Sequence, residues 1–141
     1  MEYVFLFSGQ GSQFKGMAED ICTQYPAART VIDKMSGISG EDIASFLWHT
    51  ESEELARSDR SQLAITAMQI AITTVLQEHG IPPAAAAGFS LGEFSALYAA
   101  KVLDLTTMTK LVTLRGKIMQ KYCEKLDAQS KATGAGCGIA A

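Results

Sequence analysis

The sequence is poor in the residues that mark metal sites, disulfide frameworks and membrane spans. It has two histidines and three cysteines, and the cysteines (Cys22, Cys123 and Cys137) lack the spacing of a metal site. An odd number of such cysteines is typical of reduced thiols in the cytoplasm. The most apolar segment, 63–76, is too short to cross a bilayer and contains Gln69. The chain opens with a strand pattern rather than a signal peptide, so we expect a cytoplasmic protein with no metal and no membrane association.

Positive charge is also scarce, which argues against a nucleic-acid partner. The net charge is −3, and hydrophobic and charged residues make up 48% and 19% of the 141 residues, as in a soluble globular domain. Charge is uneven along the chain, with nine acids against four bases over 19–60 and seven bases against three acids over 101–131. The basic half is either a solvated surface or a face for an acidic partner.

Hydrophobic periodicity and breaker residues predict a helix-rich chain with two short strands. The helix over 61–79 is apolar on nearly its whole circumference, which predicts a central buried helix, and Gln62 at its entrance needs a polar partner. A capping box at 50–53 predicts the start of a short acidic helix, and Thr106 is the predicted cap of the last helix. The expected strands are 3–7, as a buried strand, and 84–88; the expected helices are 16–25, 26–35, 43–48, a short one from about 50, 61–79, 91–100 and 106–126.

The stretch 84–93 organises the chain. A run of alanines is followed by Gly-Phe-Ser-Leu-Gly and then by a helical pattern. A serine in a strand, sharp turn and helix of this kind is a nucleophile, whereas in a plain glycine turn it only caps the helix. We expect Gly88 and Gly92 to permit close contact of strand and helix, and Ser90 to lie at the helix N-terminus, where backbone N–H groups stabilise an oxyanion.

Two further features bear on this serine. The glycine-rich loop 9–13 follows the first strand without Walker spacing, and is either a tight turn or a loop that approaches a ligand. Arg115 shares a helix face with apolar residues, where a guanidinium needs a partner. That partner is a protein acid such as Glu93, solvent reached along the side-chain stem, or a substrate carboxylate held in a bidentate clamp.

A general base for Ser90 is missing from the pattern. The only histidines are His49, in an expected loop, and His79, at a helix end where it complements the dipole. In enzymes with this elbow the base histidine follows the serine, and no histidine follows Ser90. The chain therefore looks chemically incomplete.

Three motifs together resemble malonyl-CoA:acyl carrier protein transacylase, a family related to acyltransferase domains of polyketide synthases and malonate decarboxylase systems. They are Phe-Ser-Gly-Gln-Gly-Ser-Gln at 7–13, Gly-Phe-Ser-Leu-Gly-Glu at 88–93 and Leu-Arg-Gly at 114–116. The resemblance implies a malonyl group carried on Ser90 and passed from coenzyme A to the phosphopantetheine of acyl carrier protein, in fatty acid or polyketide biosynthesis. No resident cofactor is implied.

The resemblance also assigns site residues. Ser90 would be the catalytic nucleophile, and the backbone N–H groups of Gln10 and Leu91 would form the oxyanion hole. Arg115 would bind the malonyl carboxylate. Gln62 would line the acyl pocket.

The chain departs from the family at several points. Phe89 stands where the family usually has histidine, which bears on pocket polarity and acyl preference, and Ser8 stands where proline is common. The family's base histidine lies further downstream, after a ferredoxin-like subdomain. The resemblance thus implies a partial α/β-hydrolase-like core, helix-rich with a short parallel sheet, as the N-terminal portion of a longer enzyme. Residues 1–127 would belong to the large subdomain and 128–141 would lead into the missing one.

Two alternatives remain open at this stage. A serine esterase or thioesterase-type hydrolase would use the same elbow, although a neutral ester needs no cationic clamp. The chain would otherwise be a non-catalytic fragment that needs a complementing segment. Oligomeric state is not predicted by any pattern.

Overall fold

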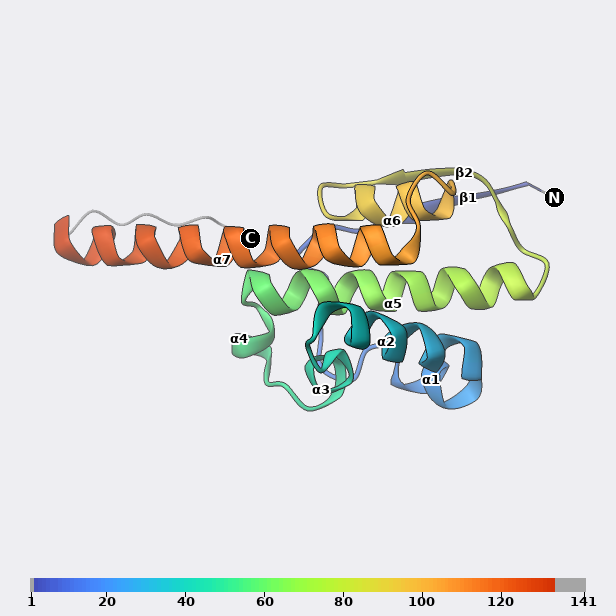
Figure 1. The fold of residues 1–141 in the computed structure, drawn as a ribbon, viewed down its shortest axis with the longest axis horizontal. Helices are drawn as coiled ribbons and strands as arrows, with labels where there is room; N and C mark the ends of the chain where they lie inside the picture. Colours follow the sequence, from blue (N-terminus) through green and yellow to red (C-terminus); the bar gives the residue numbers. More distant parts are fainter. Residues whose placement is uncertain (1, 134–141) are drawn as a thin grey trace.

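The computed structural model describes residues 2–133 and places one long buried helix, α5, at the centre of the molecule (Figure 1). On one side of α5 lie α1 to α4, and on the other lie the two-stranded sheet and α6, while α7 runs along α5 and projects beyond it. The elements are β1 (Tyr3–Phe7), α1 (Glu19–Gln24), α2 (Pro26–Ser39), α3 (Ile43–Trp48), α4 (Ser52–Leu55), α5 (Ser58–Glu78), β2 (Pro83–Gly88), α6 (Gly92–Ala99) and α7 (Leu105–Thr133).

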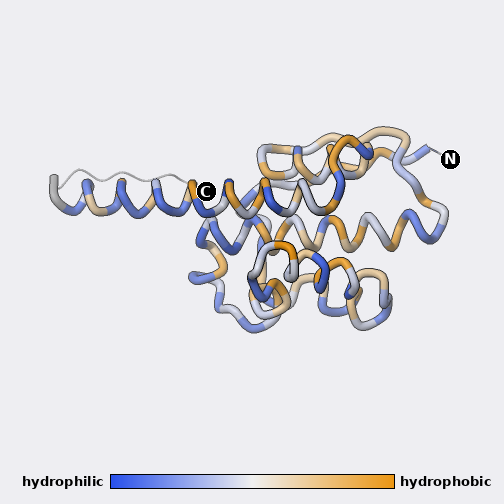
Figure 2. The backbone as a smooth tube through the Cα atoms, viewed as in Figure 1, coloured by the Kyte–Doolittle hydropathy of each residue, from blue (hydrophilic) through white to orange (hydrophobic). Residues whose placement is uncertain are grey.

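The burial of α5 confirms the prediction of a central helix. Its core residues, including Leu63, Ile65 and Ile70, are fully buried, and α5 contacts α2, α3, α6 and α7. A helix with so little polar surface is stable in water only when neighbours cover it on most sides. Hydrophobic residues accordingly gather along α5 and the elements around it, whereas hydrophilic residues predominate on the projecting end of α7 (Figure 2).

The sheet is short and parallel, as expected. β1 pairs with β2 in a register that brings Phe7 opposite Gly88, and α6 packs against both strands. The prediction that β1 is a buried strand is wrong for most of its length, because Val4 is 61% exposed and Leu6 is 78% exposed. Among the described residues β2 is the single strand that pairs with β1, so the other edge of β1 has no neighbouring strand.

Several predicted helix ends are shifted for local reasons. α1 begins later than predicted because Gly16 and Ala18 take positive φ angles, and α2 continues through Gly37 to Gly40, whose φ of 73° ends it. α5 begins at Ser58 rather than at 61. Apart from the C-terminal end of α7, the other predicted elements are in place within a residue or two.

Two predicted caps are wrong. The Thr50 hydroxyl donates to the Ser45 carbonyl instead of capping α4, and the residue before α4 makes no side-chain capping bond. At α7 the cap is the Asp104 carboxylate, which accepts from the Thr107 N–H at 2.7 Å, rather than Thr106.

α7 also runs past its predicted end near 126, to Thr133. The assignment of 128–141 as the entrance to another subdomain remains a prediction, and 134–141 lie outside the described residues. No helix among the residues described is long and apolar enough to cross a membrane.

Candidate active site

Ser90 occupies the sharp turn between β2 and α6. Its φ of 52° lies in the left-handed region, which costs a residue with a side chain about 1–3 kcal/mol. Its side chain is exposed, at the N-terminal end of α6. The predicted strand, turn and helix are therefore confirmed, with the serine in the strained conformation expected of a nucleophile elbow.

The two glycines of the elbow leave no room for a side chain. A Cβ on Gly88 would lie 2.1 Å from the Gly92 carbonyl carbon, and a Cβ on Gly92 would lie 2.2 Å from the Phe7 oxygen. All of these obstructing atoms are backbone, so no side chain can move aside. The prediction that Gly88 and Gly92 permit the close approach of strand and helix is confirmed.

The glycine-rich loop lies against this elbow. A Cβ on Gly9 would lie 2.9 Å from the Phe89 oxygen, and the Phe89 N–H donates to the Phe7 oxygen at 3.0 Å. The loop thus follows β1 directly to the nucleophile turn. Among the described residues, the N–H groups of Gln10 and Leu91 take no part in the backbone hydrogen bonds of turns and loops. The oxyanion-hole role of these two groups stays a prediction.

Arg115 reaches Ser90 from α7. One terminal nitrogen donates to the Gln62 side-chain oxygen at 2.7 Å, and the other lies 3.3 Å from the Ser90 hydroxyl oxygen. The guanidinium also lies over the Phe94 ring, 5.9 Å from its centroid. Within the described part of the chain it forms no ion pair with Glu93, so that alternative is wrong. The guanidinium has further N–H donors beyond the two used here.

Gln62 is fully buried and connects Arg115 to the glycine-rich loop. Its amide nitrogen lies 3.3 Å from the Gln10 side-chain oxygen and 3.1 Å from the Met119 sulfur. The Gln10 amide nitrogen in turn donates to the Ser58 hydroxyl at 3.1 Å. The polar partner that Gln62 requires is thus a chain of side chains that runs from Ser58 to Ser90.

Gly116 explains how α7 presents this arginine. A Cβ at Gly116 would lie 2.8 Å from the Ser58 oxygen, so the backbones of α5 and α7 meet at the start of α5. At this distance the side chain before Gly116 reaches Gln62, four residues after Ser58. The glycine of the Leu-Arg-Gly motif therefore serves the packing that brings Arg115 to the site.

Phe89 is 78% exposed, with its ring against Gly9, and does not lie in the core. An apolar cavity of about 370 Å³ lies beside the guanidinium instead. The sequence pattern placed apolar residues on the face of Arg115 but did not identify this cavity, nor the roles of Ser58 and Met119. The cavity beside Arg115 is lined by Phe94, Leu111, Leu114, Arg115, Ile118 and Met119.

Neither histidine is bonded to Ser90 in the described structure. His79 Nδ1 lies 2.8 Å from the Val75 oxygen and its ring packs edge-on against Tyr25, while His49 is exposed after α3. Both positions suit helix ends. The residues described also contain no group of three or more histidine, cysteine or acidic side chains placed to hold a metal ion.

Comparison with known proteins relates this geometry to one family. The acyl transferase domain matches residues 4–134. The malonyl CoA-acyl carrier protein transacylase of Escherichia coli O157:H7 is 38% identical over 121 residues, which are 85% of this chain and 39% of that protein. The chain therefore spans about two fifths of the length of this curated relative.

Solved structures agree. An acyl carrier protein S-malonyltransferase from Vibrio cholerae matches with a TM-score of 0.80 at 39% identity, over 85% of this chain and 40% of that one. A malonyl-transacylase in complex with a type II polyketide synthase acyl-carrier protein matches with the same TM-score and identity, over 86% of this chain and 40% of that one. The sequence match and the shared fold together show that this chain belongs to the acyl transferase domain family, of which it contains a partial, helix-rich α/β core.

Proposed function

We propose that this chain carries the acyl-binding part of a malonyl-CoA:acyl carrier protein transacylase, with Ser90 as the acyl carrier. The observation that supports it best is the contact between Ser90 and Arg115, whose guanidinium is held by the buried Gln62. A cation at hydrogen-bond distance from an exposed, strained serine suits an acyl group that bears a negative charge. The relatives named for malonyl transfer support the same substrate.

The first half-reaction transfers the malonyl group to Ser90. The serine oxygen attacks the thioester carbonyl carbon, the new C–O bond forms, and the C–S bond breaks as coenzyme A leaves. The hydroxyl proton passes to a base and then to the departing sulfur. Negative charge on the carbonyl oxygen is stabilised by the N–H groups of Gln10 and Leu91, which flank the turn.

Arg115 selects the acyl group by its free carboxylate. A bidentate pair of guanidinium and carboxylate holds the far end of the malonyl group, which aligns the thioester with Ser90. Gln62 keeps the guanidinium oriented while it is unoccupied. Phe89, at the rim of the turn, and the apolar cavity beside Arg115 bear on which substituted malonyl groups are accepted.

The base comes from outside the described residues. Neither histidine of the sequence contacts Ser90, so the chain by itself binds and aligns an acyl donor but activates the serine weakly. We therefore expect slow acylation of Ser90 and very little turnover. The second half-reaction, attack by the phosphopantetheine thiol of acyl carrier protein, needs the same base.

The protein partner is an acyl carrier protein. One structural relative was solved with such a partner, and α7 carries basic residues near the site. A basic stripe on α7 consists of Lys117, Lys121 and Lys125. Lys117 pairs with Glu41 at 2.8 Å and Lys125 lies over the Tyr122 ring, so two of the three contact this chain's own side chains. The choice of partner therefore rests on the acyl group at Ser90, which the phosphopantetheine thiol would accept, and not on the lysines.

The test is to incubate the purified chain with malonyl-CoA or acetyl-CoA and to map covalent adducts by peptide mass spectrometry. We expect a malonyl adduct on Ser90, none in Ser90→Ala, and a clear preference for malonyl-CoA that Arg115→Gln abolishes. Arg29→Gln, which removes a guanidinium from the α2 surface, is the matched control and keeps the preference. No adduct on Ser90, or an adduct without acyl preference, contradicts the proposal.

The same incubation with acyl carrier protein added separates the alternatives. Release of free malonate without transfer to acyl carrier protein would favour a hydrolase, which Arg115 beside the nucleophile argues against. Rapid multiple turnover by the chain alone would disprove the external base.

A further inference from the structure

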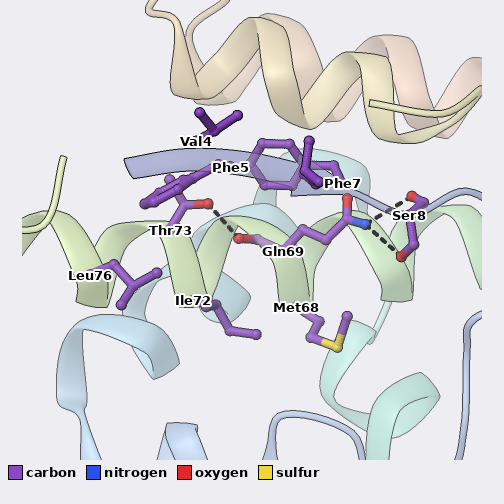
Figure 3. A pocket seen from close by; sticks show the side chains of 10 residues that line it. Val4, Phe5, Phe7, Ser8, Met68, Gln69, Ile72, Thr73 and Leu76 are labelled. Carbon is purple, nitrogen blue, oxygen red and sulfur yellow. Dashed lines mark hydrogen bonds between the residues drawn. The ribbon is translucent and has the colours of Figure 1, made fainter. Parts of the chain in front are cut away.

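A buried amide, Gln69, joins the glycine-rich loop to the elbow helix. It lies in α5 and is 6% exposed. Its nitrogen donates to the Ser8 backbone oxygen at 2.9 Å and lies 3.2 Å from the Ser8 hydroxyl, as Figure 3 shows. Its oxygen accepts from the Ser95 hydroxyl on α6 at 2.6 Å. One side chain thus bonds to both elements that border the nucleophile turn.

The neighbours of Gln69 make this arrangement specific. The pocket around it is lined mainly by apolar side chains from β1 and α5, such as Phe5, Met68 and Ile72 (Figure 3). An amide that turned away from Ser8 and Ser95 would find few polar partners there, and an unpaired buried amide is costly. The amide orientation, and with it the spacing of its two partners, is therefore fixed.

The bonds continue into the loop beyond Ser8. The Ser8 and Ser12 hydroxyls lie 3.0 Å apart, and the Ser12 hydroxyl donates to the Gly9 oxygen at 3.0 Å. These contacts brace the segment on both sides of Gln10. The other partner of Gln69, Ser95, is fully buried one turn into α6, the helix that follows Leu91.

We propose that Gln69 is a positioning residue that fixes the glycine-rich loop relative to the elbow helix and so sets the separation of the Gln10 and Leu91 N–H donors. This rests on the proposed function of those two groups. Oxyanion stabilisation depends on donors held in place before the reaction, so loosening either arm slows acylation without changing carboxylate binding at Arg115. A structural role alone would lower stability but leave the loop and the acylation rate unaffected.

The test compares Gln69→Met, which keeps the length of the side chain but removes its hydrogen bonds, with Thr73→Val. Thr73 lines the same pocket and is also buried, but its hydroxyl bonds to the Gln69 backbone oxygen and not to the loop. Thr73→Val therefore controls for loss of a buried hydrogen bond on the same helix. Amide hydrogen exchange of 9–13 is measured first, then the Ser90 acylation rate against malonyl-CoA concentration.

For Gln69→Met we expect exchange in 9–13 to rise roughly tenfold, and the maximal acylation rate to fall by a similar factor, at an unchanged half-saturating concentration. Thr73→Val should change neither. Unchanged loop exchange in folded Gln69→Met, or equal slowing of acylation by both variants, overturns the proposal. If Gln69→Met does not fold, Ser95→Ala replaces it, with a smaller rise in exchange expected and no rise contradicting the proposal. If the native chain is not acylated, the proposed function fails. Amide exchange of 9–13 still decides whether Gln69 holds the glycine-rich loop in place.

Discussion

Gly92→Ala should be among the most damaging single-methyl additions in this chain. The added Cβ would lie 2.2 Å from the Phe7 oxygen, 2.7 Å from the Phe7 carbonyl carbon and 2.9 Å from the Ser8 oxygen. Real Cβ contacts this short do not occur, and every obstructing atom belongs to the backbone of β1 or of the residue after it. Relief requires α6 to move off the sheet, which breaks the packing around the nucleophile turn.

The size of the effect follows from these distances. Overpacking that flexible side chains can relieve costs about 1–3 kcal/mol, and here nothing flexible is available, so we expect a loss of at least about 3 kcal/mol. At roughly 3–5 °C per kcal/mol for a chain of this size, the thermal midpoint falls by at least about 10 °C. Urea unfolding followed by circular dichroism gives the free energy, with thermal melts as a second measure.

Gly37→Ala is the matched control. Gly37 lies within α2 with nothing within 4 Å of an added Cβ, and alanine favours a helix over glycine by about 0.5–1 kcal/mol. The same chemical change should therefore stabilise the protein at one position and destabilise it at the other. A Gly92→Ala midpoint equal to that of the native chain would refute the close packing of β1 and α6 described above.

Three other predictions follow from single contacts. Gln62→Leu leaves a hydrogen bond of the Arg115 guanidinium unmet and should lower the free energy of unfolding by about 2 kcal/mol in urea titrations. Gln62→Glu should block malonylation of Ser90, because its carboxylate would occupy the guanidinium. Hydrogen bonds from the first turn of α7 lower the pKa of Asp104. Its contribution to stability is thus present above the ordinary carboxyl pKa and lost as pH falls through the lowered one, so native and Asp104→Ala unfolding midpoints should differ at neutral pH and converge in acid. Burial raises the pKa of the Cys22 thiol, so iodoacetamide should modify Cys22 more slowly than Cys123 in the native state and at similar rates in urea; equal native rates would contradict that burial.

The parts of the site that could be predicted from sequence are those encoded by local backbone constraints. Gly88 and Gly92 around a serine, between an apolar run and a helical pattern, predict the elbow because few residues other than glycine tolerate such contacts. The periodicity that placed Arg115 on an apolar face is also local. It correctly indicated a guanidinium in need of a partner, but only the structure identified Gln62 and Ser90 as its contacts in place of Glu93. The substrate carboxylate stays a prediction.

The rest could not be predicted because it depends on contacts between residues far apart in the chain. Gln62 required a partner, but nothing in its neighbourhood indicated that Gln10 and Met119 would meet it. The exposure of β1 is another such case, since five apolar residues predict a buried strand whether or not a second layer covers them. Caps failed for a different reason: Thr50 and Asp104 each had competing acceptors or donors a few residues away, and sequence alone does not rank them.

The polar chain through Gln62 has a consequence for how selectivity and catalysis are related in this site. The guanidinium that would hold a carboxylate also contacts the Ser90 hydroxyl, and through Gln62 it is bonded to Gln10, which carries a proposed oxyanion donor. A carboxylate that draws Arg115 away from Ser90 would free the serine oxygen for attack. Substrate binding and nucleophile release are then one event. An acyl group without a carboxylate, such as acetyl, would leave the Arg115 contact to Ser90 in place, so discrimination would appear in the rate of acylation as well as in binding.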